Sequence, residues 1–393
     1  MKPDSAADIV RTLRDHGHEA YFVGGCVRDM VLGIEPSDYD IATSAHPFDV
    51  IRLFPRTESI GAKFGVVLVI HRGHPFEVAT FRSDEAYIDG RRPSGVVFTS
   101  AREDVLRRDF TINGLLYDPV TDEVIDYVSG KDDIRAGIVR AIGDPRKRFA
   151  EDKLRVLRAI RFASRFNYRI EEWTWSALIE AAPGIHQVSR ERIREELVRT
   201  LTEGDAARGV RMLEESRLLR EALPEVRWTK HLNESLAQLK RGCSDDFAIA
   251  VLLHETAIRD AGAILERLKF SRAETHHVLD LVENLPKFSK IREMSAGALK
   301  RFFRLTRFTD HLELARIHGE HAGHEFAARK FFGWTPQEIS PAPLITGEDL
   351  IAMGMQPGPM FKQILTRVED EQLEGRLTSR EEALAMVRRR SWS

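Results

Sequence analysis

The sequence has little cysteine and no long apolar run, and each absence excludes a class of protein. Its 393 residues include only Cys26 and Cys243, too few for a disulfide framework or a cysteine-based zinc site. The longest apolar runs are Val66–Ile70 and Phe247–Leu253, far short of the ~20 residues that a membrane span needs. The first 20 residues contain acids and no apolar signal core. We therefore expect a cytoplasmic protein with no membrane contact.

Strong net charge is also absent, but charge is concentrated locally. The net charge of −2 argues against a wholesale polyanion binder, and 42% hydrophobic with 31% charged residues excludes a disordered or fibrous chain. Between Arg140 and Arg169, however, ten lysines and arginines stand against three acids. This segment predicts a focused anion site; the alternative is a solvated helix face.

The patterning changes near residue 144. Short β-rich runs before it predict strands, and the helices expected there are Ala6–His16 and Val27–Leu32. From Pro145 onward the periodicity is helical, and we expect no strand to the end. The sequence predicts an α+β protein with a small mixed head and a long helical remainder. The strands expected are Ala20–Val23, Tyr39–Ala42, Val66–Ile70, Phe76–Phe81 and Val124–Val128.

A glycine pair follows the first predicted strand and precedes a helix. In this segment Gly24 and Gly25 are followed by Arg28. Glycines let backbone N–H groups approach an anion, and an arginine can fork onto a phosphate. A simple tight turn is the alternative.

Two aspartates come ten residues later. Asp38 and Asp40 are spaced i, i+2, which puts both on one face of a strand. Two such close carboxylates suit Mg²⁺, which prefers carboxylates together with substrate phosphates. Glu77 on a later strand could be a third ligand; alternatively it is an exposed strand residue, as Asp38 and Asp40 could be a surface pair.

Two basic segments follow in the head. Arg107 and Arg108 stand beside Asp109 and Asn113, a combination that suits triphosphate contacts. The other basic segment, a polar loop within residues 87–98, is a candidate mobile lid. The lid core consists of Asp89, Gly90, Arg91, Arg92 and Pro93.

A helix is expected over residues 151–166. At 100° per residue its four arginines fall on one face, opposite an apolar face, and we expect the arginine face to meet something anionic. Asp152 precedes Arg155 by three residues, which makes their side chains neighbours on a helix. An acid beside an arginine can satisfy the Watson–Crick edge of cytosine or adenine, although a surface ion pair is the alternative. The arginines are Arg155, Arg158, Arg161 and Arg165.

In this order, these segments resemble the nucleotidyltransferases of the DNA polymerase β superfamily. They are most similar to the class II tRNA nucleotidyltransferase and bacterial poly(A) polymerase family. The resemblance divides the chain into a catalytic head (1–143), a neck (144–208), a body (209–335) and a tRNA-binding tail (336–393). Within the neck, Ser189–Leu197 resembles the family's last neck motif.

The resemblance implies template-independent addition of CCA to the 3′ end of tRNA from CTP and ATP, with tRNA rather than DNA as partner. Asp38 and Asp40 would be catalytic and would hold Mg²⁺. Asp152 and Arg155 would select the base. The residues expected to bind triphosphate are Gly24, Gly25, Arg28, Arg107, Arg108, Arg158 and Arg161.

Other activities remain open at this stage. Addition of A alone or of CC alone lies within the family, as does poly(A) synthesis, which a sequence pI near 6.7 disfavours. Outside it stand a nucleotide-binding regulator and an HD-type phosphohydrolase. His231 and His254 resemble the HD frame, but Glu255 stands where that chemistry needs aspartate, so we expect a body without hydrolase activity. No metal role is assigned to the remaining histidines, and the sequence leaves the oligomeric state open.

Overall fold

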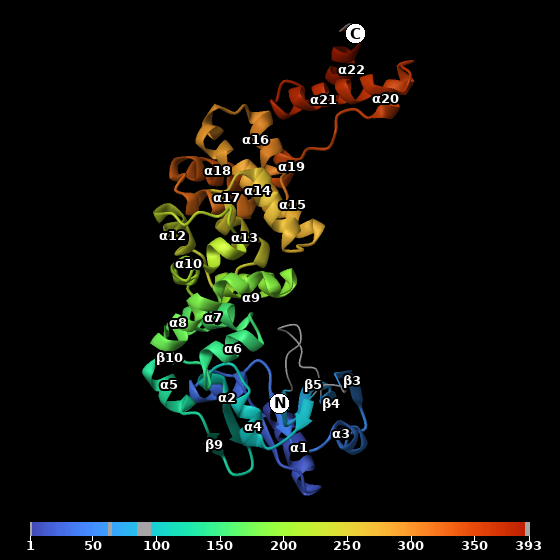
Figure 1. Cartoon of the computed structure of the whole chain (residues 1–393). Helices are drawn as coiled ribbons and strands as arrows, with labels where there is room; N and C mark the ends of the chain where they lie inside the picture. The colour runs from blue at the N-terminus through green and yellow to red at the C-terminus, as the bar shows by residue number, and fades with distance from the viewer. Residues whose placement is uncertain (1, 62–64, 85–95, 390–393) are drawn as a thin grey trace. The chain divides into compact units, whose positions relative to one another are not determined.

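The computed structural model describes residues 2–61, 65–84 and 96–389. Packing divides the chain into two compact units, Met1–Ala248 with Ala263–Lys269 and Ile249–Gly262 with Phe270–Ser393 (Figure 1). The division into head, neck, body and tail stays a prediction. Among the described residues, no helix has both the length and the apolar character that crossing a membrane would require.

A seven-stranded mixed sheet forms the centre of the head, in the order β3-β4-β5-β2-β1-β8-β9. β2 and β5 run parallel, whereas the other neighbouring pairs are antiparallel. The strands are β1 Ala20–Val23, β2 Asp40–Thr43, β3 Thr57–Gly61, β4 Val66–His71, β5 His74–Thr80, β8 Leu115–Asp118 and β9 Glu123–Asp126; two-stranded sheets pair β6 Arg82–Asp84 with β7 Val96–Phe98 and β10 Ile138–Val139 with β11 Arg169–Ile170.

The first helix shows why the head folds as it does. α1 (Lys2–Asp15) places Ala6, Ile9, Val10 and Leu13 on one stripe, and all four are fully buried. This spacing of three and four residues is the amphipathic pattern of a helix that covers a core. α1 packs on β1, β2, β4 and β5, so the stripe closes one side of the sheet.

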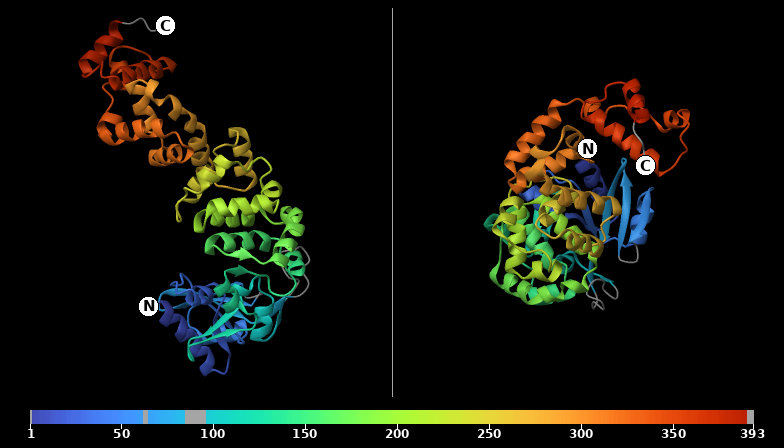
Figure 2. Two further views of the ribbon diagram at one scale, coloured as in Figure 1. Left: turned by 90° about the vertical axis from the view of Figure 1, so that its left-hand side faces the viewer. Right: turned by 90° about the horizontal axis from the view of Figure 1, so that it is seen from above.

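Helices dominate the rest of the chain, which Figure 2 shows from two further directions. In the head they are α2 Gly25–Val31, α3 Pro47–Leu53, α4 Ala101–Leu106 and α5 Gly130–Ala136. Those that follow, up to residue 253, are α6 Pro145–Glu151, α7 Arg155–Phe166, α8 Glu172–Ala181, α9 Arg190–Glu203, α10 Ala206–Glu215, α11 Leu218–Ala222, α12 Lys230–Leu236 and α13 Asp245–Leu253.

Beyond residue 253 the helices are α14 Ile258–Arg267, α15 Arg272–Asn284, α16 Ala296–Phe303, α17 Phe308–His318, α18 His321–Gly333, α19 Pro336–Ile339, α20 Gly347–Ala352, α21 Pro359–Leu373 and α22 Arg380–Arg389. Among the described residues, 3₁₀ segments occur at η2 Thr111–Asn113, η3 Ala182–Gln187 and η4 Leu285–Glu293.

The predicted α+β class is confirmed, and each predicted strand overlaps an observed one. Two expectations are wrong. β11 is a strand beyond Pro145; its two residues are too short to show a period, and only pairing with β10 defines it. The helix expected over 151–166 is broken at Asp152, which has extended backbone angles (φ −140°, ψ 106°). Its side chain accepts the Leu154 N–H at 3.0 Å, a local bond that competes with the helix.

Candidate active site

The glycine turn lies at the end of β1. Gly24 has φ 73° and ψ −128°, a conformation that side chains with a Cβ rarely adopt. Its N–H donates to the Leu115 carbonyl at 3.3 Å. A Cβ at Gly24 would lie 3.0 Å from Nη1 of Arg108. Glycine is therefore favoured here because of its backbone angles and because it lets the Arg108 guanidinium group approach the backbone closely.

Three carboxylates gather beside this turn. Val23 pairs with Asp40 across β1 and β2, so Asp40 begins its strand next to the glycines. Ile41 pairs with Val78 of β5, and the preceding residues Asp40 and Glu77 are therefore neighbours on the exposed face of the sheet. Asp38, also exposed, lies two residues before Asp40. Strand pairing thus adds Glu77 as a third acid to the predicted pair of Asp38 and Asp40.

The electrostatics of Asp40 follow from this crowding. Its side chain reaches the surface, yet protein surrounds the carboxyl group closely enough that loss of water raises its pKa, and Glu77 and then Asp38 raise it further. Arg108 opposes them, and the resulting pKa is about 6. A cluster of carboxylates that repel one another and supply hard oxygen ligands fits a divalent cation.

Asp104 orients both arginines of the Arg-Arg-Asp segment. Its Oδ1 accepts from Nε and Nη2 of Arg107 at 2.9 and 2.8 Å, and its Oδ2 accepts from Nη2 of Arg108 at 3.0 Å. Asp104 is 1% exposed, and the arginines hold its pKa low against the effect of burial. Sequence reasoning missed this residue, although its i, i+3 and i, i+4 spacing to the arginines was a usable signal.

Arg28 does not point into solvent as a phosphate ligand would. It is 4% exposed and donates to Asp29 Oδ1 at 2.7 and 2.9 Å and to Asn113 Oδ1 at 2.7 Å. Its guanidinium carbon lies 4.6 Å from the Phe166 ring centroid. As placed, Arg28 joins α2 to η2 and α7, and its predicted phosphate contact stays a prediction.

A buried ion pair connects the head to α7. Asp109 Oδ2 accepts from Nε and Nη2 of Arg158 at 2.8 and 2.7 Å, and its Oδ1 accepts from Asn113 at 3.2 Å. Burial alone would raise the pKa of Asp109, but Arg158 outweighs it and the pKa falls to about 2. Arg158 is predicted to bind triphosphate, and in this structure its guanidinium group is paired with Asp109.

Arg161 is more deeply buried than the arginine-face prediction implied. It is 4% exposed and donates to Glu196 Oε2 at 2.7 Å and to Glu203 Oε2 at 3.3 Å. Glu203 also accepts from Arg165 at 3.0 Å. The anionic surroundings of this face are thus protein carboxylates of α9. The count of charges between Arg140 and Arg169 missed them because they lie later in the chain.

Asp152 and Arg155 are not each other's side-chain partners. Asp152 Oδ2 accepts from Nη2 of Arg192 at 2.8 Å. Arg155 Nη1 donates to Glu151 Oε2 at 2.7 Å and its Nη2 to the Arg107 carbonyl at 3.2 Å. The expectation of adjacent side chains on one helix is wrong because the helix breaks between them. Their role in base selection stays a prediction.

The other predicted features belong to the lid, the body and the tail. The lid residues Asp89, Gly90, Arg91, Arg92 and Pro93 lie outside the described residues. In the body, His254 is buried, and its Nδ1 lies 2.7 Å from the Val251 carbonyl oxygen. The backbone contact restrains this ring, and the predicted lack of hydrolase activity stays untested.

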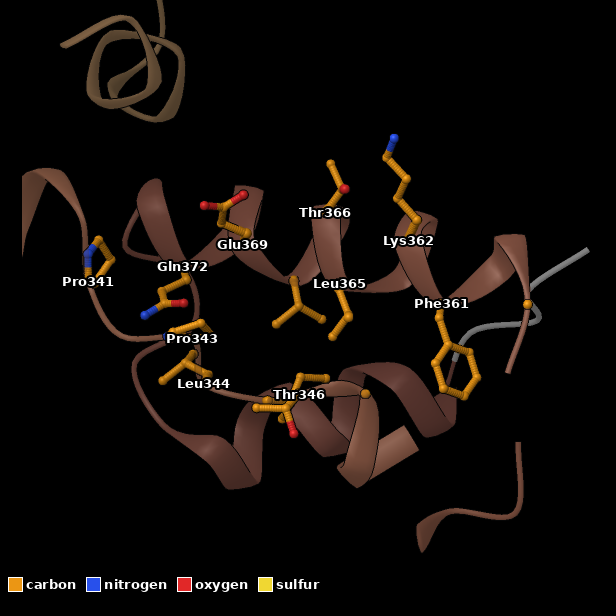
Figure 3. A pocket seen from close by; sticks show the side chains of 14 residues that line it. Pro341, Pro343, Leu344, Thr346, Phe361, Lys362, Leu365, Thr366, Glu369 and Gln372 are labelled. Carbon is orange, nitrogen blue, oxygen red and sulfur yellow. The ribbon is translucent and has the colours of Figure 1, made fainter. Parts of the chain in front are cut away.

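The tail contains a pocket of about 710 Å³ between α21 and the segment that precedes α20. Figure 3 shows Phe361 and Leu365 of α21 pointing toward Leu344 and its neighbours, whereas Lys362 points away from them. These apolar side chains flank the tail core around Ile345, Leu350 and Ile364. The wall of the pocket is therefore largely apolar, and α21 presents the charge of Lys362 on its other side.

Comparison with known proteins decides the family. A CCA-adding enzyme of Levilactobacillus brevis is 34% identical over 97% of this chain and 96% of its own. The chain belongs to the class II tRNA nucleotidyltransferase and poly(A) polymerase family. Three family models match it in order, the poly A polymerase head domain (20–140), the probable RNA and SrmB-binding site of polymerase A (167–229) and tRNA nucleotidyltransferase domain 2 (243–387).

Solved structures agree with this family. The crystal structure of the Bacillus stearothermophilus CCA-adding enzyme in complex with CTP has a TM-score of 0.79 and 30% identity, covering 99% of this chain and 98% of that one. The Thermotoga maritima CCA-adding enzyme complexed with tRNA has a TM-score of 0.71 at 21% identity, covering 98% and 94%, and shares the fold. This chain is thus a tRNA nucleotidyltransferase.

Proposed function

We propose that this nucleotidyltransferase adds C, C and A to the 3′ end of tRNA, using CTP and ATP and releasing pyrophosphate. The observation that carries the proposal is the carboxylate cluster beside the Gly24 turn, in a chain that matches CCA-adding enzymes over nearly its whole length. The CTP and tRNA complexes of the relatives support the choice of substrates.

The carboxylates fit a magnesium site. Asp38 and Asp40 would hold Mg²⁺, with Glu77 as a further candidate ligand, because ionised oxygens that repel one another are relieved by a cation. Metal held by these carboxylates would supply the chemistry of a two-metal site, in which the RNA 3′ hydroxyl loses its proton more easily and the charge on the departing pyrophosphate is stabilised. Arg108, held by Asp104 over the glycine turn, would meet the triphosphate, and the backbone N–H groups there would approach it closely.

Base selection and RNA binding involve other elements. Asp152 and Arg155 would read the Watson–Crick edge of the incoming base, and the bond from Arg192 would hold the Asp152 carboxylate in place. The helical body and the tail would hold the tRNA through shape and phosphate contacts. In the tail, the exposed Lys362 on the outer side of α21 supports such a contact.

Incorporation assays test the proposal. The purified chain is incubated with Mg²⁺, labelled CTP or ATP, and tRNA that ends at the discriminator base, at C or at CC. We expect both nucleotides to be added to the bare end. ATP used only on the CC end would identify an A-adding enzyme, CTP alone a CC-adding enzyme, and long A tails a poly(A) polymerase. Phosphate release without RNA extension would favour a hydrolase and contradict the proposal.

Substitution of Asp40 tests the metal assignment. Asp40→Ala should abolish incorporation and leave tRNA affinity nearly unchanged, because the substitution removes a metal ligand in the head but no predicted RNA contact. Filter binding and primer extension measure the two quantities separately. Asp49→Ala in α3 removes an acid of the same head and serves as a matched control. Normal turnover by Asp40→Ala would refute the assignment.

A further inference from the structure

A second, polar pocket of about 380 Å³ lies in the first compact unit, away from the carboxylate cluster. It is formed where α7 ends, α10 begins and α12 passes. Arg208 and Arg211 line it together with Asn167 and Asn233, and its apolar lining includes Leu236 and the small residue Ala206. Its volume lies at the lower end of the ~300–1,000 Å³ of small-molecule sites.

The two arginines of this pocket differ from those of α7. Arg208 donates to the Asn167 side-chain oxygen and to the Tyr168 carbonyl, both at 2.5 Å. Arg211 donates to Asn233 Oδ1 at 3.2 Å. These acceptors are neutral, and within the described ranges no carboxylate forms an ion pair with either arginine. Arg158, Arg161 and Arg165, by contrast, are each neutralised by an acid.

The remaining groups also favour an anion. Asp205 is the acid that lines the pocket, and as the N-cap of α10 its Oδ1 accepts the backbone N–H of Arg208 at 2.9 Å. Two guanidinium charges against one capped carboxylate leave the pocket positive. α10 is ten residues long, and its first turn adds the partial positive charge of a helix N-terminus. The Asn233 and Asn167 amide groups can donate further hydrogen bonds.

We propose that this pocket binds a phosphate group, supplied either by the RNA backbone or by free inorganic phosphate. Neutral acceptors hold both guanidinium groups in place without cancelling their charge, and the N–H groups that these acceptors do not engage can donate to phosphate oxygens. The polar lining and the absence of an aromatic side chain among the described lining residues do not favour a base. The RNA source rests on the proposed function, whereas binding of the free anion does not.

The test uses the full chain and two matched variants. Arg211→Gln removes one charge while keeping a polar side chain that can donate hydrogen bonds, and Arg220→Gln removes an exposed arginine of the adjacent α11 as control. Thermal shift is measured with phosphate and with chloride at equal ionic strength. Affinity for tRNA is measured by filter binding across a salt series. Arg208→Lys, which keeps the charge but loses the fork, gives a second variant.

We expect phosphate to stabilise the wild type more than chloride does, and Arg211→Gln to lose that difference while Arg220→Gln keeps it. If RNA is the source, Arg211→Gln should also weaken tRNA binding several-fold and reduce the slope of log affinity against log salt by about one. Unchanged tRNA affinity with lost phosphate stabilisation identifies the free anion. The proposal is overturned if phosphate and chloride stabilise the protein equally and both glutamine variants bind tRNA equally. That outcome would not contradict the proposed function, which nucleotide incorporation tests separately.

Discussion

At the scale of single residues, Asp40 shows how position changes the chemistry of a side chain. An aspartate begins near pKa 3.8, and burial, Glu77 and Asp38 together raise Asp40 to about 6. The raised value means that the folded chain disfavours the ionised form. The free energy of unfolding therefore falls as pH rises from about 4 to about 6, a cost that a bound cation would remove.

This gives a pH prediction for activity. Magnesium requires ionised Asp40, so at limiting magnesium the incorporation rate should rise with pH through about 6 and then level off. More magnesium should move the midpoint to lower pH because the cation favours the ionised form. Single-turnover rates between pH 5 and 8 measure this. A midpoint that does not move with magnesium, or with Glu77→Gln, would contradict it.

Asp109 shows the opposite shift. Its pKa of about 2 means that the Arg158 ion pair stabilises the fold above pH 4 and that this stability is lost as pH falls toward 2. We expect Asp109→Asn to lower the free energy of unfolding by about 2 kcal/mol near neutral pH, and by less as the pH falls below 4. Urea unfolding at several pH values checks this. An equal effect at pH 3 and pH 7 would be inconsistent with the pairing.

At the scale of elements, α7 is an amphipathic helix whose polar side is buried as well. Arg161 and Arg165 pack on aromatic rings of their own helix and pair with carboxylates of α9. The apolar positions followed from the 3.6-residue period. The burial of the arginine side did not, because a period shows which residues share a face and not what covers that face.

Two acids of α9 allow a matched test of this interface. Glu196 is 5% exposed and donors of Arg161 reach it at 2.7 Å, whereas the side chain of Glu203 is 29% exposed and accepts from the same arginine at 3.3 Å. Glu196→Gln should lower the free energy of unfolding by about 3 kcal/mol because it leaves Arg161 buried without its main counter-charge. Glu203→Gln should cost less than about 1 kcal/mol. Equal losses in denaturant unfolding would show that the two pairs are not distinguished by burial.

At the scale of the whole molecule, the chemistry and the RNA contact of the tail are expected in different units. The carboxylate cluster lies in the first unit and the tail pocket in the second. Lys362→Gln should therefore raise KM for tRNA several-fold and leave KM for CTP unchanged, since it removes one exposed cation. Steady-state kinetics measure both. Arg388→Gln in the last helix, which also removes a tail cation, is the control; a change in KM for CTP would contradict the separation.

The sequence by itself determined the local features of this protein. The α+β class and the end of β1 at the glycines follow from backbone geometry over a few residues, whereas the shared face of Asp38 and Asp40 stays a prediction because β2 begins at Asp40. Family membership followed from the order of such segments. Only the tertiary structure decided the partners of the arginines, because Arg158 meets Asp109 from 49 residues away and Arg161 meets Glu196 from 35. An ion pair between distant segments depends on how helices pack, and no short-range spacing encodes that packing.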